Sequence, residues 1–216
     1  MNIILFGPPG AGKGTQADNL VRDYNLFKVS TGDLLREEIK NKTSIGKKIK
    51  SPIDQGSLVS DVLISQLLEK IFLNKNYSNR MIFDGYPRNL NQAKNLENSI
   101  KKYNQKISCI LSLNVDLDTI IKRILGRKIC SKCGNIFNEF FNPPTPNNHK
   151  CDPKFLQMRS DDNVNTIKSR FVTYEKETLP ILKYYDGMKL LHQIDGIMEI
   201  DQIYGQIRGI IDSLEA

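Results

Sequence analysis

Short apolar runs alternate with amphipathic stretches along most of this 216-residue chain. The runs are continuously apolar, which is typical of strands in a parallel sheet that is covered on both faces. They predict strands over residues 2–6, 26–30, 81–84, 107–114 and 189–194. Helical periodicity predicts helices over residues 13–24, 32–41, 60–73, 89–101, 116–125, 161–185 and 201–214. The pattern as a whole predicts a doubly wound α/β fold, with a five-stranded parallel sheet, helices on both faces and ligands at the carboxyl ends of the strands.

The first predicted strand runs into a glycine-rich loop, Gly7-Pro8-Pro9-Gly10-Ala11-Gly12-Lys13-Gly14-Thr15. Its glycines allow positive φ and bring backbone N–H groups close to an anion, and Lys13 adds a cation for the outer phosphates of a nucleotide. The commonest P-loop has Ser or Thr directly after the Lys, whereas here Gly14 intervenes and the hydroxyl comes from Thr15. A strand, this loop and a helix in that order predict a nucleotide-phosphate site.

Composition and charge exclude few classes of function. Lys and Arg number 31 against 24 Asp and Glu, and the net charge of +7 suits a nucleotide, a nucleic acid or simple solubility equally well. No apolar stretch approaches the roughly 18 residues that span a membrane. The apolar run 3–6 is too short for a signal peptide, so we expect a cytoplasmic protein.

The segment from about 126 to 160 breaks the alternation of strands and helices. It is rich in Pro and Asn and contains three of the four cysteines, which are Cys130, Cys133 and Cys151. Cys109, in contrast, lies within a predicted buried strand. In a cytosolic chain, three clustered cysteines favour a metal site over a disulfide. We therefore expect a small insertion of turns and short strands with little core of its own.

Two further strand ends carry residues suited to phosphate and base binding. The second strand ends in Ser30-Thr31-Gly32-Asp33 and is followed by Arg36, whose guanidinium can clamp a second phosphate. The third ends in Asp84-Gly85-Tyr86-Pro87-Arg88, and Gln92 follows one helical turn later. Asp84 suits a magnesium ion held through water, Arg88 suits a phosphate, and Gln92 suits a base edge.

Four more arginines flank the insertion. Arg123 and Arg127 precede it, and Arg159 and Arg170 follow it. Phosphoryl transfer depends on positioning and on positive charge spread around the moving group. Arginines that converge from several segments are therefore the residues that this chemistry requires.

Taken together and in order, these motifs, with Arg159-Ser160-Asp161-Asp162, resemble the adenylate kinase family in its long-lid bacterial form. The resemblance implies that ATP lies on Gly10, Ala11, Gly12, Lys13, Gly14, Thr15, Arg127, Ile136, Phe137 and Met198. It implies that AMP lies on Thr31, Arg36, Ser57, Leu58, Val59, Gly85, Tyr86, Pro87, Arg88, Gln92, Arg159 and Arg170. The implied catalytic set is Lys13, Asp84, Arg88, Arg123, Arg159 and Arg170, with Arg123 and Arg159 bridging to the transferring phosphoryl group.

The same resemblance implies three regions. They are a core P-loop domain of residues 1–29, 60–125 and 164–216, a mobile helical AMP-binding segment of residues 30–59, and a lid of residues 126–163. The implied reaction is reversible transfer of the γ-phosphoryl group of magnesium-bound ATP to AMP, giving two ADP. His149 and His192 lie outside the motifs, so no strong general base is expected. A monomer with no nucleic-acid or membrane partner is expected.

Relatives with a zinc-bearing lid have a second pair of ligands, Cys-x-x-Cys or Cys-x-x-Asp. Here Cys151 begins that pair, but Lys154 stands three residues later and cannot ligate as an ammonium. Structural zinc takes four ligands. Either Asp152 or His149 supplies the fourth ligand to structural zinc, or the site is degenerate and packing holds the lid.

Two other functions fit part of the sequence. A kinase for CMP, UMP or GMP shares the P-loop and arginines, although Thr31 and Gln92 favour AMP. A non-catalytic nucleic-acid-binding protein with a zinc knuckle fits the charge and the Cys-x-x-Cys motif. The latter predicts a basic stripe with interleaved aromatic residues, which the sequence lacks.

Overall fold

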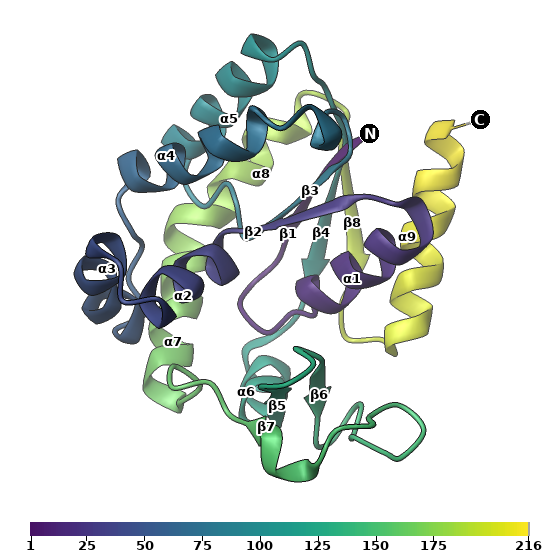
Figure 1. Ribbon diagram of the computed structural model, residues 1–216. Helices are drawn as coiled ribbons and strands as arrows, with labels where there is room; N and C mark the ends of the chain where they lie inside the picture. The colour runs from purple at the N-terminus through teal and green to yellow at the C-terminus, as the bar shows by residue number, and fades with distance from the viewer. Residues whose placement is uncertain (216) are drawn as a thin grey trace.

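A five-stranded parallel sheet forms the centre of the computed structural model, which describes residues 1–215. Its strands, in the order β2-β3-β1-β4-β8, are Phe27–Ser30, Met81–Asp84, Asn2–Phe6, Ile107–Asn114 and Leu191–Asp195 (Figure 1). All four pairings are parallel. The predicted fold class is confirmed, and each strand lies within two residues of its predicted start. Cys109 is fully buried in β4, as expected for a core residue.

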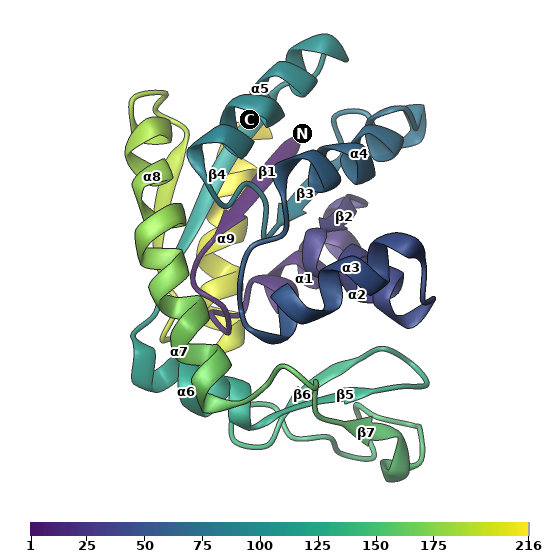
Figure 2. The same ribbon diagram turned by 90° about the vertical axis from the view of Figure 1, so that its left-hand side faces the viewer.

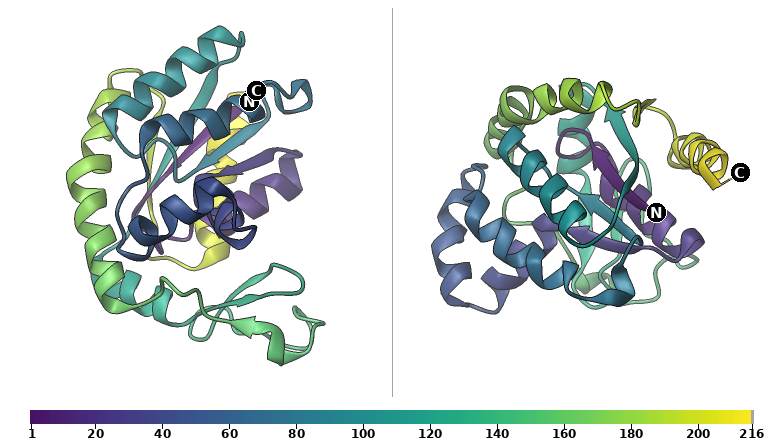
Figure 3. Two further views of the ribbon diagram at one scale, coloured as in Figure 1. Left: turned by 60° about the vertical axis from the view of Figure 1, so that its left-hand side comes forward. Right: turned by 90° about the horizontal axis from the view of Figure 1, so that it is seen from above.

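Helices cover both faces of the sheet, as Figure 3 shows. The outer helices are α1 (Lys13–Tyr24) and α9 (Ile200–Glu215) on one face and α4 (Asp61–Phe72), α5 (Leu90–Lys102) and α8 (Leu179–Asp186) on the other. Leu20 and Ile207 bury the first pair against the sheet, while Leu68 and Leu96 bury the second group. The apolar faces of the helices are thus buried against the two faces of the sheet. The edge formed by the carboxyl ends of the strands stays open for a ligand.

Two segments extend beyond that edge (Figure 2). One holds α2 (Thr31–Lys40) and α3 (Ser44–Asp54), of which the periodicity predicted only the first. The other follows α6 (Leu117–Leu125) and forms a small antiparallel sheet in the order β6-β5-β7. Its strands are Ile136–Asn138, Arg127–Cys130 and Leu156–Gln157, and a 3-10 turn lies at Pro153–Phe155; a second 3-10 turn, Lys75–Tyr77, joins α4 to β3 in the core. The insertion therefore consists of turns and short strands, as predicted.

The helix predicted over residues 161–185 is interrupted and begins later than expected. Asn163 caps α7 (Val164–Thr173), and its side chain accepts a hydrogen bond from the Thr166 amide. A π-helical segment, Tyr174–Thr178, then leads into α8. Pro180 in the first turn of α8 has no N–H to donate, and a widened turn before it relieves the clash that a proline ring causes in a regular helix.

No helix in the described residues 1–215 is long and apolar enough to cross a membrane.

Candidate active site

The glycine-rich loop joins β1 to α1 and curls around an anion-binding space. Gly7, Gly10 and Gly12 have φ of 145°, 85° and 96°, conformations that L side chains rarely adopt. A Cβ on Gly10 would lie 2.7 Å from Cγ1 of Ile124 in α6, so the glycine also permits close packing. The loop thus has the backbone geometry that the sequence predicted.

Lys13 is folded back onto this loop. Its ammonium donates hydrogen bonds to the carbonyl oxygens of Gly7 at 2.7 Å and Pro8 at 2.9 Å. Burial lowers the pKa of Lys13 from 10.5 to about 8, and the nearby charge of Asp84 opposes this effect. The charged form is therefore poorly compensated until an anion arrives.

One cavity of about 340 Å³ lies between the P-loop, the α2–α3 segment and the lid. All ten residues predicted for ATP line it, and so do Asp84 and the six arginines Arg36, Arg88, Arg123, Arg127, Arg159 and Arg170. Thr31, Tyr86 and Gln92 line a smaller neighbouring cavity of about 20 Å³, which shares Arg88, Gly85, Leu58 and Val59 with the large one. The fold therefore gathers every predicted nucleotide residue around two adjoining spaces.

Asp84 ends β3 opposite the first turn of α1. Its Oδ2 lies 3.7 Å from where a Cβ on Gly14 would stand, so the carboxylate lies beside the start of α1, and Asp84 and Thr15 both line the large cavity. Lys28 is also close to this point. A carboxylate and a hydroxyl facing the phosphate space are ligands that suit a hydrated magnesium ion.

Three of the arginines are paired with carboxylates that the sequence analysis did not assign. Arg36 pairs with Asp33, Arg170 with Asp161, and Arg127 with Asp162, whose Oδ2 accepts from Nε at 2.8 Å. Burial alone would raise the pKa of Asp161, but the charge of Arg170 holds it below its usual value. The carboxylates neutralise guanidinium groups that face the cavity. The runs Ser30-Thr31-Gly32-Asp33 and Arg159-Ser160-Asp161-Asp162 contain these carboxylates and were the available signal.

Arg88 and Arg159 carry charges that are less well paired. Burial, followed by the charge of Arg170, lowers the pKa of Arg88 to about 10, and burial followed by Arg127 does the same for Arg159. Arg88 donates from Nε to the Gly85 carbonyl at 2.7 Å, while the Nε of Arg159 is buried without a partner. Crowded, buried cations of this kind form a strong anion site.

Arg123 lines the large cavity beside the P-loop and is held by backbone carbonyl groups. Its guanidinium donates to the carbonyl oxygens of Gly196 at 2.7 Å and Ile197 at 3.3 Å, next to Met198. The ring of Phe141, a cavity-lining residue that the sequence analysis missed, lies 5.5 Å from the guanidinium carbon. Adjacent phenylalanines at positions 140 and 141 in a polar insertion were the available signal. Arg123 also donates to the carbonyl oxygen of Ala11 in the P-loop at 3.4 Å, so it lies between that loop and the Gly196–Met198 turn, and its bridging role stays a prediction.

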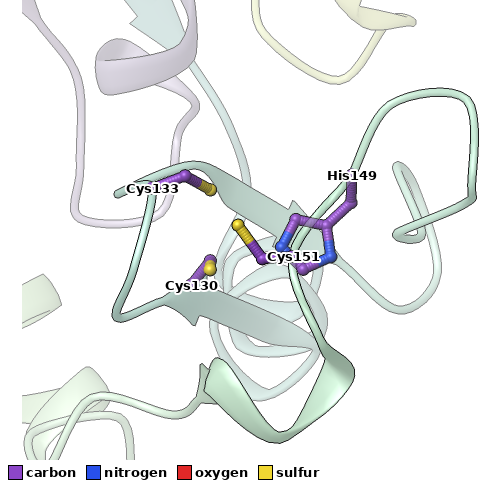
Figure 4. Close-up of side chains that lie close together, drawn as sticks. All are labelled: Cys130, Cys133, His149 and Cys151. Carbon is purple, nitrogen blue, oxygen red and sulfur yellow. The ribbon is translucent and has the colours of Figure 1, made fainter.

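The lid brings four potential metal ligands together (Figure 4). The ligand atoms of Cys130, Cys133, His149 and Cys151 all lie within 4.8 Å of one another. His149 is 8% exposed, packs edge-on against Phe137, and has a buried Nε2 without a hydrogen-bond partner. Three thiols and an imidazole match the donor set that zinc prefers.

Of the two fourth ligands considered, only His149 joins this cluster. The carboxylate of Asp152 instead caps the short helix that follows it and accepts from the Lys154 amide at 2.9 Å. Burial opposes ionisation of Cys130, but a hydrogen bond from the Cys133 backbone and its other neighbours lower the pKa of the thiol to about 6. The cluster is therefore prepared to bind a cation.

Comparison with known proteins gives a single family. The family model described as adenylate kinase matches residues 5–190. A protein of Pelagibacter ubique named adenylate kinase is 47% identical over 211 residues, which cover 98% of this chain and 99% of that protein. Proteins of the same name from Enterococcus faecalis and Archaeoglobus fulgidus are 38% and 35% identical, and the matches cover 98% and 100% of this chain and 99% and 100% of those proteins.

Proposed function

Because the chain belongs to the adenylate kinase family and so transfers a phosphoryl group from ATP to AMP, we propose how its two cavities divide that reaction. The observation that carries the proposal is the joint lining of adjoining cavities by the P-loop and by converging arginines. The large cavity takes ATP together with the phosphate of AMP, and the AMP base takes the place of the small cavity, which at about 20 Å³ must widen to admit it. A kinase for CMP, UMP or GMP is not favoured, since the relatives are named adenylate kinase.

ATP binds on the P-loop in this proposal. The amides of Gly10 to Thr15 cradle its phosphates, and Lys13 exchanges its carbonyl partners for phosphate oxygens. Arg127, with Ile136 and Phe137 of the lid, closes over the nucleotide, while Met198 lies against the adenine. Asp84 and Thr15 would hold the magnesium ion of ATP, which would supply positive charge beside the transferring phosphoryl group.

AMP binds with its phosphate between Arg36, Arg88 and Arg170, the first and last of which leave their carboxylate partners. Its base enters the small cavity beside Thr31 and Gln92. The AMP phosphate is already ionised near neutral pH, so the acceptor oxygen needs no base. The protein's task is to align donor and acceptor and to stabilise charge, in which the buried cation of Arg159 takes part.

We propose that two segments, the AMP-binding segment 30–59 and the lid 126–163, move against a core of residues 1–29, 60–125 and 164–216. Closure excludes water, which otherwise competes with AMP as acceptor.

We further propose a monomeric, cytoplasmic enzyme that needs no nucleic acid or membrane partner. Light scattering on the purified protein tests the monomer, because a dimer would double the mass of 24.7 kDa.

The test of the function is a coupled assay of ADP formation with ATP and each of AMP, GMP, CMP and UMP. AMP is expected to give the highest kcat/KM, and a dinucleotide that joins both substrates is expected to inhibit competitively with each of them. Equal or higher rates with another monophosphate would contradict the assignment of the small cavity to adenine.

We also propose that the lid cluster holds one structural zinc ion through Cys130, Cys133, His149 and Cys151. Metal analysis of protein purified without chelator tests this, with one zinc per chain expected. His149→Ala and Cys133→Ser should each lower the zinc content and the melting temperature. Asp152→Ala is the matched control and should retain zinc, because that carboxylate lies outside the cluster. A metal-free wild-type protein would refute the zinc site and leave the kinase assignment untouched.

A further inference from the structure

The side chain of Gln92 is held at both of its polar atoms. It is 3% exposed and lies at the wall of the small cavity, in the first turn of α5. Its Oε1 accepts a hydrogen bond from the Arg88 amide at 2.8 Å, and its Nε2 donates one to Oδ1 of Asp61 at 2.7 Å. Its backbone is fixed as well, since the Gln92 amide donates to Asn89 and the Gln92 carbonyl accepts from the Tyr86 hydroxyl.

These two partners leave only one orientation for the amide. A backbone N–H can only donate, so the atom facing Arg88 must be the oxygen. An ionised carboxylate can only accept, so the atom facing Asp61 must be the nitrogen. A rotation of the amide by 180° would set two donors against each other at Arg88 and two acceptors against each other at Asp61. The assignment therefore follows from the chemistry of the partners.

Asp61 is itself held in place as an acceptor. Asn89 donates to its Oδ1 at 3.1 Å and Asn91 donates to its Oδ2 at 2.6 Å. Burial works against ionisation, but the hydrogen bonds from Asn91, Gln92 and Asn89 together hold the pKa of Asp61 below its usual value. Asp61 does not line the cavity, so it acts on a bound base only through Gln92.

After these bonds, Gln92 has one N–H and one oxygen lone pair left for a ligand. A purine with a 6-amino group presents an acceptor at N1 and a donor at N6, which match this pair. A purine with a 6-oxo group presents the reverse order, with a donor at N1 and an acceptor at O6. A freely rotating amide would match either order, whereas a fixed amide matches only one.

We infer that Asp61 is a positioning residue that fixes the amide of Gln92 in the orientation that accepts a 6-amino purine and rejects a 6-oxo purine. This inference rests on the proposed binding of the AMP base in the small cavity. It assigns the choice between purines to a carboxylate that does not touch the substrate. Mismatched buried polar groups account for large discrimination between otherwise similar ligands.

The experiment compares AMP with inosine monophosphate, which has the same shape but carries a 6-oxo group and an N1 proton. The readout is the ratio of kcat/KM for the two acceptors at saturating ATP. Asp61→Ala should lower this ratio about tenfold, because it removes the carboxylate that opposes the flipped amide and leaves only the Arg88 amide to hold the orientation. Asp61→Asn keeps an oxygen that accepts the hydrogen bond from Gln92. Its ratio should therefore lie within about threefold of the wild-type ratio, because only the charge on this one hydrogen bond is lost.

Asn91→Ala is the matched control, because it removes a partner of Asp61 and leaves the contact between Asp61 and Gln92 intact. Its ratio should equal that of wild type. A purely structural role of Asp61 would lower kcat/KM for both acceptors equally and leave the ratio unchanged, which would overturn the inference. Should Asp61→Ala fail to fold, Asp61→Ser serves instead, since serine suits a helix start but its hydroxyl is too short to reach Gln92.

A Gln92→Ala background separates this inference from the proposed function. If Gln92→Ala leaves the ratio unchanged, the base does not bind there and the proposed function of the small cavity fails. If Gln92→Ala lowers the ratio and the Asp61 variants do not, only the inference fails. If the proposed function and the inference are both correct, adding Asp61→Ala to Gln92→Ala should change the ratio no further, as expected for two residues that act as one unit.

Discussion

Lys13 should take up a proton when a nucleotide binds, because burial in the free protein disfavours its charged form. Its pKa in the free protein is about 8, because burial outweighs the attraction of Asp84. Phosphates that replace the carbonyl oxygens of Gly7 and Pro8 as partners favour the charged form and raise the pKa of Lys13 toward or above its ordinary value of 10.5. Between these two values the complex holds a proton that the free protein lacks.

The expected size follows from the free-protein value. At pH 9 roughly one-tenth of Lys13 is charged before binding, so uptake approaches about 0.9 proton, whereas at pH 7 it is about 0.1. Binding therefore weakens as pH rises through 8, by about tenfold between pH 7 and pH 9. ATP itself contributes no protons at pH 9, since its phosphates are already fully ionised there.

The assay is titration calorimetry of magnesium-bound ATP in two buffers of different ionisation enthalpy at pH 7, 8 and 9. The difference in apparent heat divided by the difference in buffer enthalpy gives the number of protons taken up. Lys13→Arg is the control, because a guanidinium stays charged throughout this pH range. Proton uptake by this variant at pH 9 should therefore be close to zero. Equal heats in both buffers at pH 9 for the wild type, or equal uptake by Lys13→Arg, would refute the reasoning.

Three further changes probe the site and its support. Arg88→Ala should lower kcat by orders of magnitude with an unchanged circular dichroism spectrum, because a buried cation at the phosphate site is lost; near-normal turnover would contradict its role. Gly10→Ala should raise the Kd of ATP at least tenfold while the Kd of AMP stays the same, since a Cβ clashes with Ile124 and strains a positive φ; titration calorimetry with each nucleotide checks this. Asp162→Ala should lower the free energy of unfolding by about 3 kcal/mol, because a buried pair is broken. Urea denaturation compares it with Asp18→Ala, an exposed pair expected to cost under about 1 kcal/mol.

Local sequence patterns were enough to predict most of the fold. The apolar runs identified all five central strands, because strands covered on both faces are mostly apolar, as in β1 and β4, while β8 at the edge of the sheet tolerates His192 and Gln193. The helix caps Asp116 and Asn163 show how local the boundaries are, since each accepts a hydrogen bond from an amide three residues later. The bounds of α3, within the segment expected to be helical, were not predicted because its lysines and Pro52 obscure the periodicity, and its buried residue Ile49 packs against parts of the chain far away in sequence.

The sequence by itself determined the phosphate chemistry. Glycines at the positions that require positive φ, Lys13 and the arginines are recognisable without a fold, since their geometry or charge is a property of the residue itself. Only the tertiary structure decided which side chains meet. It brought His149 and not Asp152 to the lid cysteines, set Arg123 beside Gly196, and placed Asp61 behind Gln92, 31 positions away along the chain. These pairings depend on loop closures across tens of residues, and no local pattern encodes where two distant side chains come within hydrogen-bond distance.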